Sequence, residues 1–295
     1  MITTRQWKVI AILFLLAVPS GVTAQDSVSV NEGFIQTDSL SAKKVIASGV
    51  VGGLLVGSLV SSYFDWWKGS NEPFHIVHEG VFNDYSLGVD KLGHMYTSYF
   101  YFHTFRNIML WGGYGRSAAL WWSAGTTAFF AVSIEIGDGL SPFGFSFEDL
   151  AFNMAGLGYG ILQTEFPFLR NFALKWSYVP RTGYRWPPHF TDNYDWHTYW
   201  LAVNVHNLLP EAWRKYWPAF LNVAVGYGVD DYAANGKVVR TREVAVGLDF
   251  NLEAFQIDNQ EILLLQKIVN MIHLPAPAVK FTGEKEPRYY LFSLD

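Results

Sequence analysis

Three ionisable residues stand at the beginning of an otherwise apolar, aromatic segment. Asp90, Lys91 and His94 belong to the stretch GVDKLGHMYTSYFYFH, residues 88–103. Residues three and four apart share one face of a helix, so these side chains are predicted to lie together. Carboxylate, ammonium and imidazole groups are suited to general acid–base catalysis, and carboxylates with imidazole also bind metal ions.

Further polar residues stand at the ends of two more apolar segments. The segments 90–111, 117–137 and 147–165 are predicted helices, and the links between them are short enough to make neighbours antiparallel. Up-down-up geometry then brings the polar ends of all three helices together. The candidate site predicted there has seven members: Asp90, Lys91, His94, Glu135, Asp138, Asp149 and Asn153.

Several of these residues also have structural explanations. Asp90 is suited to N-cap its helix, and Ser146 with Asp149 fits a capping box. Asn153 is suited to a hydrogen bond between helices. Glu135 is harder to explain in this way, because a carboxylate at a helix C-terminus faces the negative end of the helix dipole.

The balance of charge limits the chemistry open to the site. Four carboxylates face one lysine and one histidine. A raised carboxyl pKa or a protonated His94 would suit acid–base catalysis, whereas a bound cation would suit metal-dependent hydrolysis. In either case Glu135 is the favoured general base, His94 is an acid, a base or a metal ligand, and Lys91 stabilises anionic charge. A structural salt-bridge network would satisfy the same charges, and the sequence leaves the cofactor unknown.

The composition places the chain near a membrane. Of its 295 residues 50% are hydrophobic, 17% are aromatic and only 16% are charged, against about 25% charged in soluble domains. Aromatic residues are enriched at membrane interfaces. The net charge of −5 and the absence of a basic run argue against nucleic acid as a partner.

The N-terminus predicts export. Arg5 and Lys8 precede an apolar run, and small residues lead to Ala24, so residues 1–24 form a predicted signal peptide. Residues 25–42 are a predicted polar leader. The chain has no cysteine, so the sequence predicts neither a cysteine-linked lipid nor a disulfide.

Residues 43–167 are predicted to form a membrane-type bundle of about four helices. Its first segment, residues 45–64, has 20 residues without a charge, which is long enough to span a bilayer. Gly49, Gly53, Gly57 and Ser61 recur every four residues and favour close approach of a second helix. A buried helix of a soluble protein with a glycine-rich packing face is the alternative.

Residues 168–295 are predicted to be rich in antiparallel β-strands. Five stretches alternate with β-branched and aromatic residues, and Asn235-Gly236 is typical of a hairpin turn. A helix is predicted near 258–273. The fold class is therefore α+β.

A longer pattern resembles two bacterial families. DKLGH followed by IEIGDGLSPFGFSFEDLAFNMAGLGYG resembles the YfiM-like predicted periplasmic lipoproteins and is distantly similar to the VanZ-like membrane proteins. The matching positions are Asp90, Lys91, His94, Glu135, Asp149, Asn153 and Gly156. Two features depart from these families: the lipoprotein cysteine is missing, and no arginine precedes Asp149 in PFGFSFED. The resemblance implies a shared site and no particular reaction.

These observations predict an exported protein of a bacterial cell envelope, associated with the outer membrane, the periplasmic face or the inner membrane. One hypothesis is a non-catalytic structural or interaction role. The other is a membrane-embedded acid–base or metal-dependent hydrolase acting on an envelope lipid or glycan. The predicted partners are membrane lipid and another envelope protein, the latter bound through the β-rich region.

Overall fold

The computed structural model describes residues 42–180, 193–234, 237–283 and 285–292. Helices dominate the N-terminal half and an antiparallel sheet the C-terminal part, which confirms the α+β class. The described residues contain seven α-helices rather than about four, because three shorter helices lie among the strands. The predicted signal peptide lies outside the described residues.

The chain divides into two compact units. The first comprises residues 1–78 and 101–150, and the second residues 79–100 and 151–295. Two helices, α3 (Val89–Trp111) and α5 (Phe147–Glu165), pass without a break from one unit to the other. Within each helix, neighbouring turns therefore keep a fixed relation. The predicted domain boundary at residues 167 and 168 stays a prediction.

The first unit holds α2 (Ala42–Ser62), α4 (Arg116–Gly139) and the second half of α3. A π-helical turn, η1 (Tyr63–Trp67), continues α2. Leu55, Phe130 and Ile134 form the core of this unit. A short parallel pair, β1 (Ile76–Val77) with β2 (Phe145–Ser146), joins the segment before α3 to the start of α5.

Helix α2 is the one helix among the described residues that is long and apolar enough to cross a membrane. Within the span Ala42–Trp67, the most apolar window of 18 residues has a mean hydropathy of 1.9, and only 17% of that window is buried. A Cβ atom at Gly49, Gly53 or Gly57 would meet nothing within 4 Å, so this stripe packs against no described helix. The structure therefore does not show the membrane-type bundle that the sequence predicted.

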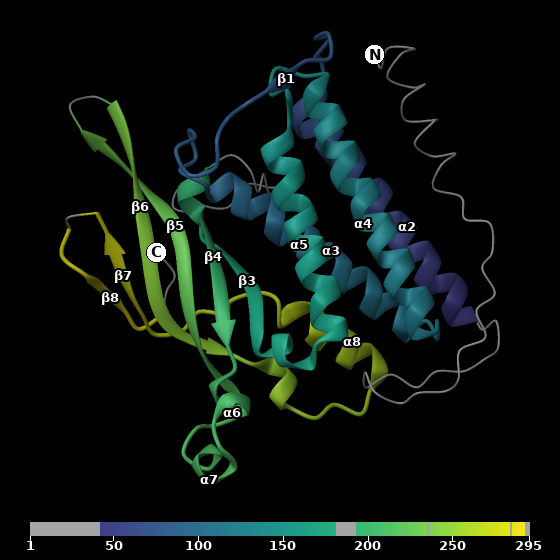
Figure 1. Cartoon of the computed structure of the whole chain (residues 1–295), viewed down its shortest axis with the longest axis vertical. Coiled ribbons are helices and arrows are strands. Elements are labelled where there is room, and N and C mark those ends of the chain that lie inside the picture. Colours follow the sequence, from purple (N-terminus) through teal and green to yellow (C-terminus); the bar gives the residue numbers. More distant parts are fainter. Residues whose placement is uncertain (1–41, 181–192, 235–236, 284, 293–295) are drawn as a thin grey trace. The chain divides into compact units, whose positions relative to one another are not determined.

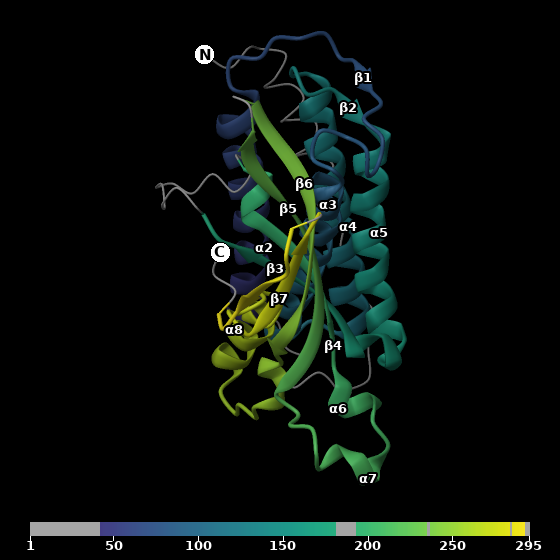
Figure 2. The same ribbon diagram turned by 90° about the vertical axis from the view of Figure 1, so that its left-hand side faces the viewer.

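The second unit is built on a six-stranded antiparallel sheet in the order β3-β4-β5-β6-β7-β8 (Figure 1). Its strands are β3 (Phe172–Tyr178), β4 (His197–Val203), β5 (Leu221–Ala234), β6 (Lys237–Phe250), β7 (Ala278–Thr282) and β8 (Arg288–Tyr290). Figure 2 shows β5 and β6 as two long, twisted strands that run side by side. They pair from Ala234 and Lys237 down to Leu221 and Phe250, which confirms the predicted hairpin.

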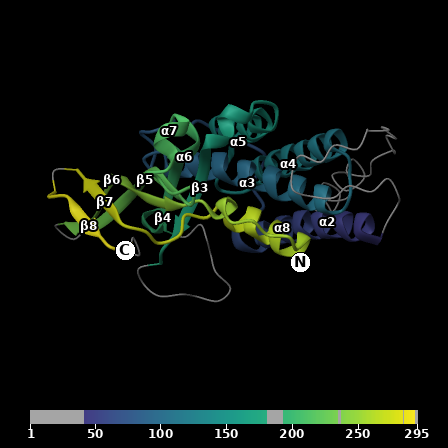
Figure 3. The ribbon, with the colours of Figure 1, turned by 90° about the horizontal axis from the view of Figure 1, so that it is seen from below.

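Five strands were predicted for the C-terminal region, and its described residues contain six. The additional strand is β7, a short segment that directly follows Pro277. Beside the strands lie α6 (Val205–Leu208), α7 (Glu211–Arg214) and α8 (Gln260–Val269), together with the short 3-10 turns η2 (Pro167–Asn171), η3 (Tyr194–Trp196) and η4 (Leu252–Ala254) (Figure 3). Helix α8 ends before the predicted residue 273, because the chain there pairs with Trp176 of β3.

Within the second unit, helix α3 packs on the sheet and on α5. Tyr96 and Tyr99 form a buried cluster with Met271, against which Trp176 and Tyr199 pack. The approach of α5 to α3 depends on one glycine. A Cβ atom at Gly156 would lie 1.9 Å from the carbonyl oxygen of Met95, so only glycine fits there. This close packing brings the polar residues of α3 and α5 into contact.

Candidate functional site

The first turn of α3 is capped by residues of the preceding loop. The backbone N–H of Gly88 donates to Asp84 Oδ1 at 2.7 Å, and that of Asp90 donates to Ser86 Oγ at 3.1 Å. Asp84 and Ser86 thus satisfy amides that a helix start leaves without partners. The carboxylate of Asp90 is therefore not used as the cap of its own helix, and it turns to other groups.

Lys91 lies among three carboxylates. Its Nζ is 2.7 Å from Glu79 Oε2, 3.2 Å from Asp90 Oδ2 and 4.0 Å from Asp84 Oδ2. The lysine side chain is 0% exposed. A buried ammonium needs such compensation, because removal from water costs several kcal/mol per ion. This group of four residues, the Lys91 cluster, ties the loop 79–88 to α3.

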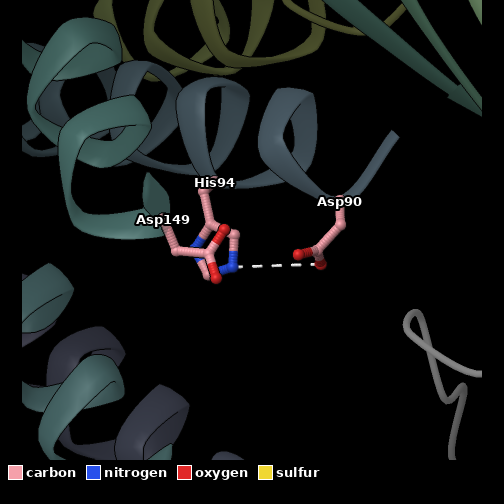
Figure 4. Close-up of side chains that lie close together, drawn as sticks. All are labelled: Asp90, His94 and Asp149. Atoms are coloured by element: carbon pink, nitrogen blue, oxygen red, sulfur yellow. Dashed lines mark ion pairs between the residues drawn. The ribbon is translucent and has the colours of Figure 1, made fainter. Parts of the chain in front are cut away.

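Asp90 also joins the lysine to His94. The Asp90 Oδ1 atom lies 3.9 Å from His94 Nε2 and accepts a hydrogen bond from the Tyr194 hydroxyl at 3.1 Å. Figure 4 shows Asp90 and His94 projecting from successive turns of α3. Their side chains are 17% and 20% exposed, so this part of the site is open to solvent, unlike Lys91.

The phenol of Tyr194 is held in its protonated form. Burial raises its pKa, and the negative charge of Asp90 raises it further. Tyr85, whose hydroxyl is 3.0 Å from that of Tyr194, has a raised pKa for the same two reasons. Tyr194 is thus a permanent donor to Asp90 at neutral pH.

Asn153 of α5 orients the imidazole ring from the other side. Its Nδ2 atom lies 3.1 Å from His94 Nδ1, and its Oδ1 accepts a hydrogen bond from the Ser98 hydroxyl at 2.8 Å. Asn153 and Ser98 are buried. The interhelical hydrogen bond predicted for Asn153 is present, and its partner is the candidate histidine.

The first unit contains the other three candidate residues, which are Glu135, Asp138 and Asp149. Ser146 Oγ accepts a hydrogen bond from the backbone N–H of Asp149 at 3.1 Å, as expected for the N-cap of α5. The backbone N–H of Ser146 lies 3.4 Å from Glu135 Oε2, so the glutamate takes the return bond of the capping box. Asp138 accepts a 2.6 Å hydrogen bond from Trp67 Nε1. These contacts anchor the ends of α4 and α5.

Asp149 also has a fixed place relative to Asn153. It lies in the first turn of α5, four residues before Asn153 on the same unbroken helix. Residues four apart lie on one helix face, so Asp149 shares the face with which Asn153 meets His94.

Some residues of this site carry no sequence signal. Asp84 and Ser86 stand in an irregular loop, and Tyr194 comes from a short 3-10 turn more than a hundred residues after Asp90. Glu79 follows the histidines of HIVHEG and was a weaker candidate than the seven residues. Only the tertiary arrangement shows that these side chains serve Lys91 and Asp90.

A second buried lysine lies inside the sheet. Lys175 Nζ is 2.8 Å from Asp249 Oδ2, and the other carboxylate oxygen lies 3.1 Å from His273 Nδ1. Asn222 donates to the same carboxylate at 3.0 Å, and Trp200 stacks on the imidazole with 3.9 Å between ring centres. All five side chains of this Lys175 cluster are buried.

Burial has opposite effects on the two ions of this pair. It lowers the pKa of Lys175, although Asp249 partly offsets the shift. Burial alone would raise the pKa of Asp249, but hydrogen bonds from His273, Lys175 and Asn222 and the charge of Lys175 together lower it. The carboxylate is therefore the strongly stabilised member of the cluster.

Residues 78–165 match the model of a family described as "Predicted periplasmic lipoprotein (DUF2279)". The matched stretch includes all seven candidate residues and supports an exported, envelope-associated location. No curated protein and no solved structure matches the chain. The similarity to VanZ-like membrane proteins stays a prediction.

Proposed function

We propose that the exposed half of this site binds a divalent cation and that the protein is a metal-dependent hydrolase of the cell envelope. The observation that carries this proposal is the placement of His94. One ring nitrogen faces the carboxylate of Asp90, and the other is hydrogen-bonded to the amide of Asn153. Histidines that ligate metals have such a partner on the second nitrogen, which fixes the tautomer and the ring orientation.

The Asn153 amide permits the tautomer that a metal requires. A Ser98 hydroxyl both donates and accepts, so it satisfies either end of the Asn153 amide. With the amide oxygen turned to the ring, His94 Nδ1 carries the proton and Nε2 presents a lone pair toward Asp90. With the amide nitrogen turned to the ring, Nε2 carries the proton and presents it toward Asp90 instead. Cation binding selects the first state.

Asp90 and Asp149 supply oxygen ligands in this proposal. Asp90 stands one turn before His94 on α3, and Asp149 stands one turn before Asn153 on α5. One imidazole and two carboxylates form a set that suits Zn²⁺ or Mn²⁺. These three residues would hold the cation, and the cation would supply the Lewis-acid chemistry that activates water for hydrolysis at neutral pH. Envelope lipids and glycans are the proposed substrates.

Lys91 takes a structural role in this proposal. Its ammonium is not exposed, and three carboxylates surround it. It therefore holds Asp90 in place and does not touch a substrate. Glu135 is likewise buried and anchors the start of α5 through Ser146.

The test is the metal content of the full chain purified in detergent, dialysed, and supplied with ZnCl₂ or MnCl₂. The wild type is expected to hold one cation per chain, and His94→Ala is expected to lose it while circular dichroism stays unchanged. His78→Ala is the matched control, because that side chain is 75% exposed and contacts Glu148, which lies outside the proposed site. Hydrolysis of envelope lipid and glycan fractions by the loaded wild type, but not by His94→Ala, would then establish the reaction.

A non-catalytic role is the second candidate, and the Lys91 cluster favours it. Four ionisable groups that fix a loop to a helix are sufficient for a purely structural network. This alternative predicts no cation in the wild type and a sharply lowered melting temperature for His94→Ala. That result would remove the metal-dependent proposal.

A further inference from the structure

Strand β6 buries its acidic residues and exposes its valines, which is the reverse of the usual pattern. Glu243 and Asp249 are 2% and 0% exposed, whereas Val244 and Val246 are 40% and 43% exposed. An antiparallel sheet in water usually buries its apolar face and exposes its polar one. Since successive side chains of a strand point to opposite faces, the buried carboxylates lie on one face of β6 and the exposed valines lie on the other.

The register extends the apolar face across five strands. Leu201 of β4 pairs with Val225 of β5, Val225 with Val246 of β6, Val246 with Val279 of β7, and Val279 with Tyr289 of β8. None of these five side chains is charged. Leu201, Val225 and Tyr289 are 41%, 48% and 80% exposed. We call this row and the exposed Phe281 beside it the outer face.

The opposite face explains why this inversion is stable. On that side Lys280 is 3.0 Å from Glu243 Oε1, and Arg288 is 2.9 Å from Glu243 Oε2. Ala224 and Ala245 let these long side chains and Trp200 fill the space. The charges are paired within the sheet, so the polar face needs no contact with bulk water.

Next to the outer face, the same side of the sheet is covered within this unit. Helix α3 packs on Trp176 and Tyr199 at the β3–β4 end. Two residues before Val244 on β6, Arg242 donates to the carbonyl oxygen of Phe82 at 2.6 Å, which holds the loop 79–88 over the strands. Tyr199 pairs with Tyr227 and Tyr227 with Val244, so both covers lie on one side of the row that holds Val225. The described residues leave that row partly exposed.

We propose that the outer face rests on a lipid bilayer. It presents aliphatic and aromatic groups without a side-chain donor or acceptor until the phenol of Tyr289, which stands on the edge strand. Such a surface can contact lipid hydrocarbon without leaving a polar group unpaired, and tyrosines are enriched at the boundary between hydrocarbon and water. The sheet lies on the membrane and does not span it, because β8 leaves an unpaired edge that hydrocarbon does not tolerate.

The chain itself provides a clean experiment, because it has no cysteine. Val246→Cys in the full chain receives a single environment-sensitive fluorophore, and the protein is mixed with vesicles of phosphatidylethanolamine and phosphatidylglycerol. Lys215→Cys, exposed beside α7, is the control. The label at 246 is expected to be quenched several-fold more by spin-labelled lipid than by aqueous iodide, and the label at 215 to show the reverse.

A second position on the same row, Val225→Cys, keeps the test valid if one variant folds poorly. The readout is local, so membrane binding through α2 alone would leave both labels open to iodide, and that result would overturn the proposal. Efficient disulfide formation between 246 positions of two chains would also overturn it, because a second copy would then cover the outer face. Neither result depends on the metal proposal.

Discussion

Two buried lysines of the second unit, Lys91 and Lys175, differ in what surrounds them. Lys91 has three carboxylates within 4.0 Å, and one of these, Asp90, is partly exposed and reaches His94. Lys175 has one carboxylate, Asp249, which is 0% exposed and already bound by a buried histidine. One cluster has excess negative charge at a surface, whereas the other is nearly balanced inside the sheet.

This difference indicates which cluster is suited to binding a ligand and which is suited to stabilising the fold. A carboxylate shared between a buried lysine and an accessible imidazole has a partner that a cation or substrate can reach. In the Lys175 cluster every contact points inward, and Trp200 covers the imidazole. The same residue types therefore have different roles, and exposure and charge balance decide between them.

The largest expected effect on stability comes from removing the carboxylate of the Lys175 cluster. Asp249→Ala leaves Lys175 and His273 buried without their anion, so the free energy of unfolding should fall by about 3–5 kcal/mol. Urea unfolding measures it. Asp258→Ala removes an exposed carboxylate from the same unit and should change stability by less than about 0.5 kcal/mol. Equal effects of the two variants would refute the structural role.

A smaller effect is expected where α5 meets α3. Gly156→Ala places a methyl group against the Met95 carbonyl and should cost about 1–3 kcal/mol, as overpacking does. Gly158→Ala is the matched control on the same helix, since its Cβ would meet nothing within 4 Å. That control should be neutral or slightly stabilising. A harmless Gly156→Ala would mean that α3 and α5 do not pack closely in solution.

Asn153 distinguishes a positioning role from a structural one. Asn153→Ala should weaken cation binding by about 10–100-fold, as loss of such an orienting partner does. The imidazole ¹⁵N shifts of His94 should also show a changed tautomer population. Titration calorimetry and nuclear magnetic resonance measure the two quantities. Unchanged affinity in a folded Asn153→Ala would place Asn153 outside the site.

The smallest expected effect is a pH dependence of stability that arises from the Lys175 cluster. The pKa of Asp249 is lower in the folded chain than its ordinary value of 3.8. Its contribution to stability is therefore full above that value and is lost as the pH falls toward the folded pKa. The stability difference between wild type and Asp249→Asn should shrink below about pH 4. A difference that stays constant with pH would contradict the assigned pKa direction.

The sequence predicted the elements better than the site. Residues 90–111 and 147–165 were predicted helices and correspond to Val89–Trp111 and Phe147–Glu165, because long apolar segments between turn residues leave little choice. Strand β7 was missed, since five residues beside Pro277 give a weak alternation. Asp90 was suited to a cap, but Asp84 and Ser86 took that role.

For the site, the contact between His94 and Asn153 follows from the up-down-up prediction, which places the starts of the first and third helices at the same end. The partners Tyr194 and Asp84 do not, because no local pattern states which loop returns to a helix. Nor does the sequence state that Lys91 would be fully buried. The buried pair Lys175 and Asp249 was also hidden, since each stands singly in a strand whose pairing sequence alone does not give.

Thermal melting of His94→Ala and His273→Ala, each with and without ZnCl₂, compares the two clusters most directly. Zinc should raise the Tm of the wild type and of His273→Ala, although His273→Ala alone should melt several degrees lower. His94→Ala should melt near the wild type and show no response to zinc. The account would be contradicted if zinc left the Tm of the wild type unchanged and His94→Ala melted as low as His273→Ala.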